Sequence, residues 1–185
     1  MTQRLAVFAS GTGSLLEAMI AEDLPIELVV TDRECRALGV AREAGIDRIF
    51  LVRNFSKDFD RETYTENLVQ LLRTREIDLI AMAGFMTVFS PAMFADGAYK
   101  LKVLNTHPSL LPSFKGDHAV KDALAAGVKV SGCTIHWATE ELDAGLILTQ
   151  EAVKVLPGDT VESLHERIKV VERELYPLIL RELIC

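Results

Sequence analysis

The sequence predicts an α/β protein with a doubly wound, mostly parallel sheet, an antiparallel edge and a long C-terminal helix. Three features predict this fold class. Through about the first hundred residues, apolar runs of strand length alternate with segments of helical periodicity, the order that gives a parallel sheet with right-handed crossovers. The runs are apolar at every position, which is typical of strands covered on both faces. Beyond residue 128 the pattern changes to two β-rich segments and one amphipathic segment.

The first half of the chain supplies the parallel strands. The apolar run Leu5 to Ala9 ends in a glycine turn, Ser10-Gly11-Thr12-Gly13-Ser14, and apolar residues follow at helical spacing, so we expect strand, turn and helix. Asp58 is the expected N-cap of a long helix that ends at Arg75. The remaining elements expected here are strands over 26–30, 48–52, 77–83 and 101–104, a helix over 36–44 and a short helical piece near Pro91.

The second half supplies the edge and the final helix. Residues 130–139 and 147–155 are β-rich and are joined by a turn around Asp143-Ala144-Gly145, so we expect them to pair antiparallel at one edge of the sheet. Residues 160–183 have helical amphipathicity, and we expect this helix to be bent or interrupted at Pro177. Since no repeat or linker divides the sequence, we predict one domain over residues 1–185.

Composition and charge exclude several classes of protein. The chain has 185 residues, 49% of them hydrophobic, and a net charge of -7 with 20 scattered Lys and Arg, which argues against a nucleic-acid partner or an anionic membrane surface. Three widely spaced cysteines suit neither a disulfide framework nor a metal site and fit a reducing cytoplasm. The chain shows no signal peptide and no apolar segment of ~18 residues. We therefore expect small ligands, no metal and a cytoplasmic location.

The glycine turn has three possible interpretations. In a dinucleotide-binding fingerprint the third glycine would stand at Leu16, so that fingerprint fails, although Asp32 lies where a ribose-binding acid would fall. A helix that begins directly after glycines can bind a phosphate through free backbone N–H groups. The turn can equally serve only to start the helix, and the turn by itself leaves these alternatives open.

Asn105, His107 and Asp143 are the candidate catalytic groups. Asn105 and His107 are two residues apart at the end of an apolar strand, so their side chains point the same way in extended backbone. Asp143 stands in a glycine-containing turn, and a carboxylate beside an imidazole orients it and favours its cationic form. An amide and an imidazolium can stabilise the oxyanion formed when an amine attacks an acyl carbon. Taken singly, they are equally a turn former, a core histidine and a hairpin residue.

The segment Asn105-x-His107-Pro108-Ser109-Leu110-Leu111-Pro112 resembles the signature of the folate-dependent formyltransferases. Together with the glycine turn, five further segments extend the resemblance over nearly the whole chain: Ala83-Gly84-Phe85-Met86, Ser113-Phe114-Lys115-Gly116, Gly132-Cys133-Thr134-Ile135-His136, Leu142-Asp143-Ala144-Gly145 and Gly158-Asp159-Thr160. They are most similar to the branch of the family that formylates glycinamide ribonucleotide. Several motifs in the right order are more specific than any one alone.

The resemblance implies a Rossmann-like formyltransferase fold and an enzyme of purine biosynthesis. The enzyme would transfer the formyl group of 10-formyltetrahydrofolate, a co-substrate, to the amine of glycinamide ribonucleotide, with no tightly bound cofactor. It implies a ribonucleotide-binding half over about residues 1–100 and a catalytic, folate-binding half over about residues 101–185. The chain would act as a monomer or a homodimer, and its partners would be these two small molecules.

The resemblance also implies roles for individual residues. Asn105, His107 and Asp143 are similar to the family's catalytic residues. The residues expected to bind the ribonucleotide are Gly11, Gly13, Ser14, Leu15 and Glu172. The residues expected to bind the folate are Arg61, Met86, Thr87, Val88, Phe89, Asn105, Thr139, Glu140 and Glu141.

Two positions depart from the family's pattern. Leu15 replaces an Asn of the phosphate loop, so a side-chain contact is lost while the backbone N–H groups remain. Residues 117–120 also differ, and His118 is either a substrate contact or an ordinary loop residue. Lys115 is either a mobile contact to a substrate or a solvated side chain, and His165 is interpreted as a solvated helix residue. The resemblance further implies that the Leu111–Pro112 peptide is cis.

Other functions use part of the same pattern. A hydrolase of the same folate, or a formyltransferase acting on methionyl-tRNA or a sugar nucleotide, shares the Asn, His and Asp. We expect the ribonucleotide enzyme instead, because those relatives carry additional domains and the chain is acidic. A non-catalytic nucleotide-binding module could use the glycine turn but has no use for the three catalytic groups together.

Overall fold

A computed structural model describes residues 3–95 and 101–184, and its strands form one sheet in the order β3-β2-β1-β4-β5-β6-β7. The strands are β1 (Leu5–Ala9), β2 (Ile26–Thr31), β3 (Asp47–Phe50), β4 (Leu79–Met82), β5 (Lys102–His107), β6 (Val130–Trp137) and β7 (Ile147–Lys154). The first five strands are parallel, whereas β6 and β7 pair antiparallel at the edge. The predicted fold class is confirmed.

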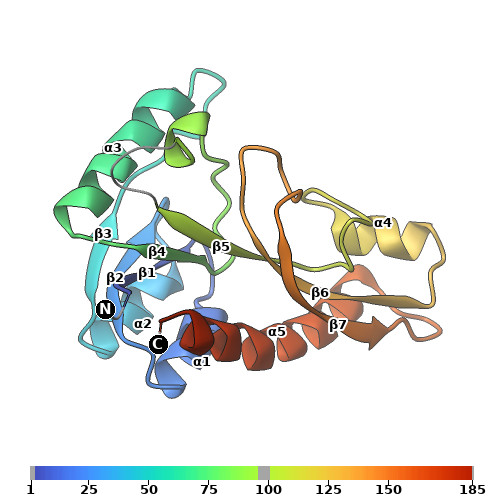
Figure 1. Ribbon diagram of the computed structural model, residues 1–185. Helices are drawn as coiled ribbons and strands as arrows, with labels where there is room; N and C mark the ends of the chain where they lie inside the picture. The colour runs from blue at the N-terminus through green and yellow to red at the C-terminus, as the bar shows by residue number, and fades with distance from the viewer. Residues whose placement is uncertain (1–2, 96–100, 185) are drawn as a thin grey trace.

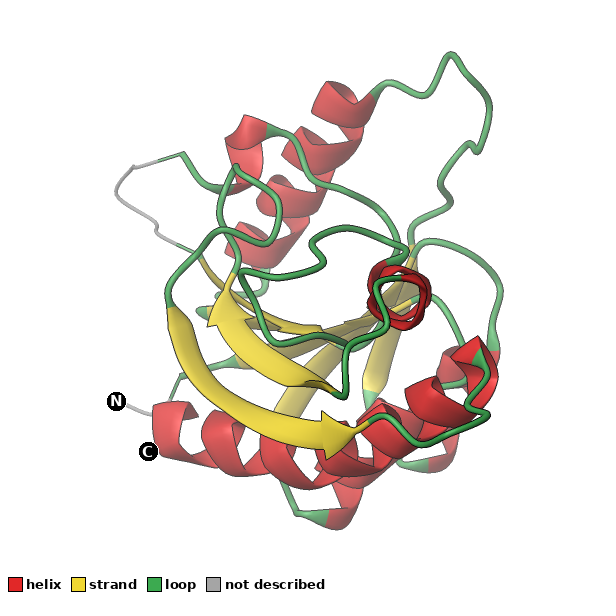
Figure 2. Ribbon diagram, turned by 90° about the vertical axis from the view of Figure 1, so that its right-hand side faces the viewer, coloured by secondary structure: helices red, strands yellow, loops and turns green. Residues whose placement is uncertain are grey.

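Helices cover both faces of the sheet. They are α1 (Ser14–Ala21), α2 (Arg36–Glu43), α3 (Arg61–Thr74), the 3-10 helix η1 (Pro91–Met93), α4 (Ala119–Ala125) and α5 (Val161–Ile184). α3 and η1 lie on one face, and α1, α2 and α5 lie on the other, with α5 running the length of the sheet (Figures 1 and 2). Among the described residues, no helix is long and apolar enough to cross a membrane.

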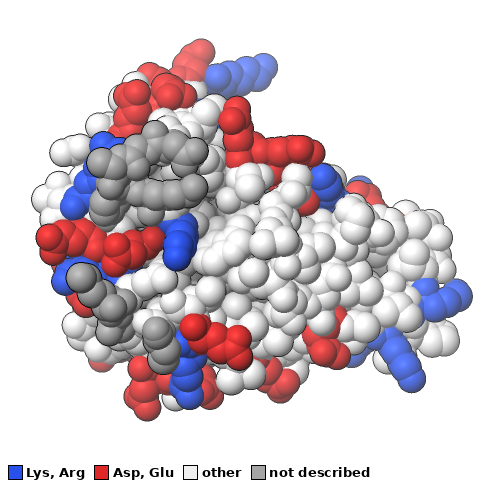
Figure 3. All heavy atoms as spheres, in the orientation of Figure 1, with Lys and Arg blue, Asp and Glu red and all other residues white. Residues whose placement is uncertain are grey.

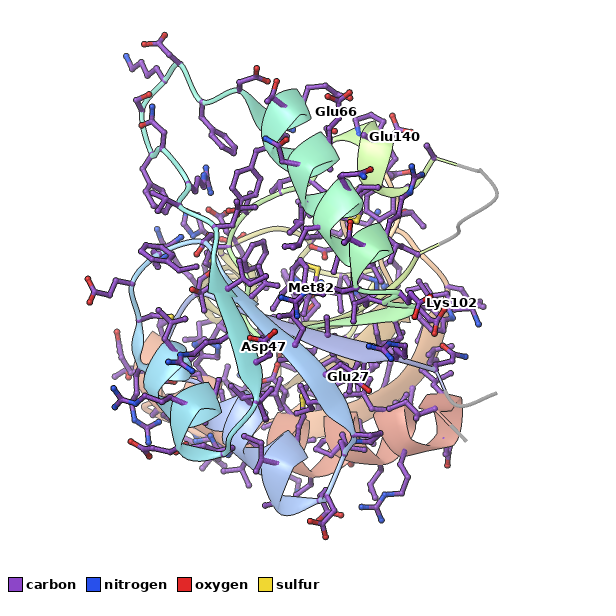
Figure 4. The ribbon with its side chains drawn as sticks, turned by 90° about the vertical axis from the view of Figure 1, so that its left-hand side faces the viewer. Glu27, Asp47, Glu66, Met82, Lys102 and Glu140 are labelled. Atoms are coloured by element: carbon purple, nitrogen blue, oxygen red, sulfur yellow. The ribbon has the colours of Figure 1, made fainter. Side chains whose placement is uncertain are left out.

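Alternating residues of each central strand fill two hydrophobic cores. On β1, Leu5 and Val7 belong to the core beneath α1 and α5, whereas Ala6 and Phe8 belong to the core beneath α3. Met82 is the last residue of β4 and packs against the core beneath α3. Figure 4 labels Met82 near the centre of the molecule. Because both faces are covered, the central strands read as continuous apolar runs.

The strand order places the glycine turn at a natural ligand site. The order reverses between β1 and β4, and in open α/β sheets ligands bind beyond the carboxyl ends of the strands at such a point. Two hydrogen bonds join the segments that follow these strands: Ser10 N donates to Gly84 O at 3.3 Å and Met86 N donates to Ser10 Oγ at 2.9 Å. The turn after β1 and the segment after β4 therefore share one crevice.

Two local predictions need correction, and one helix was not predicted. α3 begins at Arg61 and its N-cap is Asp60, not Asp58, because Asp60 Oδ1 accepts a hydrogen bond from Thr63 N at 3.0 Å. α5 is not interrupted at Pro177, whose neighbour Tyr176 is fully buried. The helix that was not predicted is α4, which has seven residues and a short apolar face that packs beside α5.

Charged side chains are mixed over the surface. On the face shown in Figure 3, Lys and Arg alternate with Asp and Glu over the region of α2 and α3, and a broad uncharged area covers the side of β5 to β7. No large patch of one sign is visible on that face. This distribution agrees with a small-molecule ligand better than with a nucleic acid.

Candidate active site

A cavity of about 540 Å³ lies at the carboxyl ends of the central strands. Most of its lining comes from the turn after β1, the segment after β4, the end of β5 and the loop that follows it, the loop after β6, and one face of α5. A cavity of this size is typical of a site for small molecules. Segments far apart in the sequence thus meet around one space.

Most of the predicted site residues line this cavity. They are Gly11, Gly13, Ser14, Leu15, Met86, Thr87, Val88, Phe89, Asn105, Thr139, Glu140, Asp143 and Glu172. Arg61, Glu141 and His107 lie outside the lining. Arg61 is the exposed first residue of α3, Glu141 is exposed beside Lys115, and His107 is buried behind the cavity wall. The roles given to these residues stay predictions.

Asp143 lies next to both buried histidines of the site. Its Oδ2 is 3.3 Å from Nδ1 of His107, and its Oδ1 is 3.7 Å from Nε2 of His136. The Asp143 backbone has a φ of 52°, and Gly116 N donates to Oδ2 at 2.8 Å. A left-handed residue of this kind is uncommon outside glycine and is tolerated best by Asp and Asn. The turn thereby directs the carboxylate inward instead of toward solvent.

The ring of His107 has an acceptor at each nitrogen. Nδ1 faces the Asp143 carboxylate, and Nε2 donates to the carbonyl oxygen of Phe114 at 2.8 Å. Only 5% of His107 is exposed, and the ring is not part of the cavity lining. Asn105 and His107 share one face of β5, as their spacing predicted, but Asn105 alone of the two lines the cavity.

His136 is a site residue that the sequence analysis did not single out. It lies directly opposite Asn105 in the antiparallel pair of β5 and β6, and Asn105 Nδ2 is 3.3 Å from its Nε2. A register shift at Ile135 and His136 marks a β-bulge against β7, a feature often found beside active sites. Only the strand pairing, which the sequence does not show, brings this ring to Asn105.

The hydrogen bonds of His136 define its tautomer. Nδ1 faces the carbonyl oxygen of Trp137 at 3.0 Å and so carries the proton, which leaves Nε2 to accept from Asn105. Burial lowers the pKa of His136, although the Trp137 carbonyl and Asp143 oppose that effect. The ring is therefore neutral near neutral pH, and its short distance to Asp143 is not an ion pair.

The glycine turn closes the cavity at the first helix. Gly13 has a φ of 76°, and a Cβ built on it would lie 3.0 Å from the Cα of Ala37, so both conformation and space require glycine. Ser14 starts α1, and the N–H groups of the first turn have no acceptor within the helix. This end of the cavity suits an anion. Leu15 is buried in the core and lines the cavity as well.

One face of α5 forms the opposite wall. His165, Ile168, Lys169 and Glu172 line the cavity at helical spacing. His165 is half-buried and lines the cavity, so it is not the ordinary solvated helix residue that was expected; burial lowers its pKa, and Lys169 adds to that effect. The ammonium of Lys169 lies 2.8 Å from Glu166 Oε1, within reach of the cavity. Of these four residues, the sequence predicted a binding role only for Glu172; the other three reach the cavity because α5 packs beside α1.

Glu172 has an unusual environment for an acid. Burial raises its pKa, and a hydrogen bond with Thr106 only partly opposes this effect. Next to it, Tyr176 is fully buried and donates its hydroxyl to Leu104 O at 2.8 Å. A desolvated carboxyl group in a cavity is a common sign of a functional residue.

Asp32 supports the segment after β4 from behind. It is fully buried, accepts from Thr87 Oγ1 at 2.7 Å and pairs with Arg33 at 3.0 Å. Burial opposes its ionisation, but hydrogen bonds from Arg33, Thr87 and Ser10 lower the pKa of Asp32 below its usual value. The carboxylate oxygens of Asp32 already accept hydrogen bonds from Arg33 and Thr87, so they are not free to bind a ribose. Asp32 therefore does not support the dinucleotide interpretation of the glycine turn.

Two smaller expectations also have outcomes. The Leu111–Pro112 peptide is cis, as the resemblance implied. His118 is exposed, lies 3.7 Å from Asp117 and stands at the N-cap of α4. Within residues 3–95 and 101–184, no three His, Cys, Asp or Glu side chains are grouped so as to hold a metal ion.

Comparisons with known proteins show the family of the chain. The model of the formyl transferase family matches residues 3–180. A phosphoribosylglycinamide formyltransferase of Mycobacterium tuberculosis is 45% identical over 177 residues, which cover 93% of this chain and 80% of that protein. The trifunctional purine biosynthetic protein adenosine-3 of Homo sapiens is 40% identical over 96% of this chain and 18% of its own length. A crystal structure of phosphoribosylglycinamide formyltransferase from Streptococcus pneumoniae matches with a TM-score of 0.88 and 36% identity, covering 100% of both chains.

Proposed function

The chain belongs to the formyl transferase family, and on that premise we propose that it formylates glycinamide ribonucleotide in purine biosynthesis. The formyl group comes from 10-formyltetrahydrofolate, and the products are formylglycinamide ribonucleotide and tetrahydrofolate. One observation carries the proposal: Asn105 and Asp143 line the same cavity as the glycine turn of α1. Groups suited to an acyl transfer and a site suited to a phosphate thus share one space.

The ribonucleotide lies along α1 and α5 in this proposal. Its phosphate binds the free N–H groups of residues 13–15 and the ammonium of Lys169, both of which border the cavity. Its ribose hydroxyls bind Glu172 on the same face of α5. This orientation directs the amine of the substrate toward Asn105.

The folate lies against the segments after β4 and β6. Met86 to Phe89 and Thr139 to Glu140 line the cavity and form the walls of the pterin pocket. Arg61 and Glu141, outside the lining, contact the parts of the folate that extend beyond the cavity. Each substrate is therefore bound by residues of both halves of a single domain over residues 1–185.

The reaction is a direct acyl transfer. The amine attacks the formyl carbon, and the formyl oxygen becomes an oxyanion that accepts a hydrogen bond from Asn105. The amine loses a proton to Asp143, directly or through a water, and the proton passes to N10 of the folate as the bond from N10 to the formyl carbon breaks. No covalent intermediate with the protein is required.

His107 acts through the two groups beside its ring. In the free protein its Nε2 donates to the Phe114 carbonyl, and its Nδ1 lies 3.3 Å from Asp143 Oδ2. To donate to the oxyanion, Nε2 must exchange the Phe114 carbonyl for the formyl oxygen, because one N–H serves one well-aligned acceptor. We therefore expect residues 113–116 to shift when both substrates are bound.

The test compares two reactions of the purified protein. With 10-formyltetrahydrofolate and glycinamide ribonucleotide together, we expect tetrahydrofolate and formylglycinamide ribonucleotide in equal amounts, and with the folate alone almost none. Tetrahydrofolate formed equally in both reactions would identify a hydrolase. If neither reaction gives a product, the chain is better described as a nucleotide-binding module, and the proposal is contradicted.

Two further properties are proposed. Every group used above comes from one copy of the chain, so we propose that a monomer is active and that a homodimer would contain two independent sites. Specific activity should then be unchanged on dilution. The cytoplasmic location expected from the sequence stays a prediction.

A further inference from the structure

Gln150 connects the outermost strand to the buried centre of the site. The residue belongs to β7, yet its side-chain nitrogen Nε2 donates to Thr134 Oγ1 and to Leu111 O, each at 2.9 Å. Gln150 pairs with Thr134 across β7 and β6, and Thr134 pairs with His107 across β6 and β5. The three side chains therefore stand in one row on the same face of the sheet.

The hydroxyl of Thr134 at the middle of this row is fully used. It donates to Ser109 O at 2.6 Å and accepts from Leu111 N at 3.0 Å and from Gln150 Nε2. A hydroxyl has one donor position and two acceptor positions, so these three bonds leave no position of the Thr134 hydroxyl free. Thr134 and Ser109 are wholly buried, whereas Gln150 itself is exposed on the edge strand.

The segment held by this row in turn holds the catalytic groups. Ser109 Oγ donates to Ser113 O at 2.6 Å, and the next carbonyl, that of Phe114, accepts from His107 Nε2 at 2.8 Å. Two residues later, Gly116 N donates to Asp143 Oδ2 at 2.8 Å. A displacement of residues 109–116 therefore moves the hydrogen-bond partners of both His107 and Asp143.

We propose that Gln150 is a positioning residue for the formyl transfer, which sets the orientation of His107 and Asp143 by holding residues 109–116 against Thr134. The expected kinetic effect of this inference rests on the proposed function. The hydrogen bonds that connect Gln150 to residues 109–116 do not depend on that function. Gln150 touches neither substrate site: Thr134 and Leu111 lie between it and His107. Its removal should lower the rate of the chemical step and leave the binding of both substrates unchanged.

The kinetic test uses Gln150→Leu, which keeps the size of the side chain and removes its amide. Because a shift of about 1 Å in a catalytic group costs on the order of 100-fold in rate, we expect kcat to fall about 10- to 100-fold with KM unchanged for both substrates. Gln150→Glu should behave similarly, since a carboxylate cannot donate to Leu111 O. The matched control is Glu151→Gln, the next residue on β7, whose exposed side chain faces the other way.

Two measurements separate positioning from a general loss of structure. In a His107→Asn background, Gln150→Leu should lower kcat by a much smaller factor than in the wild type, because coupled residues are not additive. The ring signals of His107 in ¹⁵N-correlated NMR spectra should shift in Gln150→Leu and stay unchanged in Glu151→Gln. Multiplicative kinetic effects together with unchanged ring signals would overturn the proposal. If the wild-type chain forms no formylglycinamide ribonucleotide, the proposed function fails, while the ring signals still decide whether Gln150 positions His107.

Discussion

Asn105 and His136 face each other across β5 and β6, with 3.3 Å between Asn105 Nδ2 and His136 Nε2. Since His136 is neutral and carries its proton on Nδ1, Nε2 accepts one N–H of the Asn105 amide. The second N–H of that amide remains for the cavity. The histidine thus fixes the direction in which Asn105 donates, and this arrangement preorganises an oxyanion site before the substrate is bound.

Replacing Asn105 by alanine should lower kcat about 100- to 1000-fold, the usual cost of one oxyanion donor. The KM for glycinamide ribonucleotide should change little, because in the proposed orientation the phosphate and ribose are bound by other residues. Steady-state kinetics of Asn105→Ala against Asn54→Ala, an exposed asparagine in a loop, would measure the effect. A rate for Asn105→Ala close to that of the control would exclude Asn105 as the donor.

Replacing Asp143 by asparagine should lower kcat about 100- to 10000-fold, the range expected for a general acid–base group. Asn fits the left-handed backbone at this position and can still accept from Gly116 N, so the fold should persist. The variant lacks the charge that faces His107 and the oxygen that takes the amine proton. Full activity of Asp143→Asn, measured beside the exposed control Asp122→Asn, would contradict the proposed proton transfer.

Periodicity predicted the parallel sheet and its antiparallel edge, because continuous apolar runs and glycine turns are signs of local conformation. The resemblance to the family implied part of the cavity wall. His136 and Lys169 were not predicted as site residues. Their positions at the cavity depend on which strands and helices are neighbours, and a local sequence pattern does not show this. The N-cap at Asp60 was missed for a smaller reason, since Asp58 and Asp60 are both suitable and only the hydrogen bond from Thr63 distinguishes them.

The same limit applies to His107. Its spacing from Asn105 correctly placed both on one face of β5, and the turn at Asp143 correctly supplied a carboxylate. The contact of His107 Nε2 with the Phe114 carbonyl could not be predicted, because it depends on the path of residues 109–116 over the sheet. That path is set by Thr134 and Gln150 from two neighbouring strands.

Glu172→Gln should stabilise the protein at neutral pH. The pKa of Glu172 is raised in the folded state, chiefly by burial, so ionisation of this group opposes folding. Below about pH 4.5 the carboxyl is protonated in both states and contributes nothing; as pH rises toward the folded-state pKa, the wild type loses stability and the neutral glutamine does not.

The difference in Tm between Glu172→Gln and wild type should therefore grow from pH 4.5 to pH 8, by about 2–4 °C for each kcal/mol in a chain of this size. The KM for the ribonucleotide should rise about 10-fold or more from the lost charged hydrogen bond. Thermal unfolding at a series of pH values would decide the point. A Tm difference that is constant with pH would show that ionisation of Glu172 costs no stability.

Lys169→Met should weaken the binding of the ribonucleotide and leave the chemistry intact. Methionine keeps the apolar stem that packs along α5 but removes the ammonium that borders the phosphate end of the cavity. A hydrogen bond to a charged group contributes about 1.5–3 kcal/mol, so KM for glycinamide ribonucleotide should rise about 10- to 100-fold at an unchanged kcat and an unchanged KM for the folate. The wild-type KM should increase with salt concentration, and this dependence should be weaker in Lys169→Met because one phosphate contact is missing. Equal salt dependence in the two proteins would place the phosphate away from Lys169, and so away from the junction of α1 and α5.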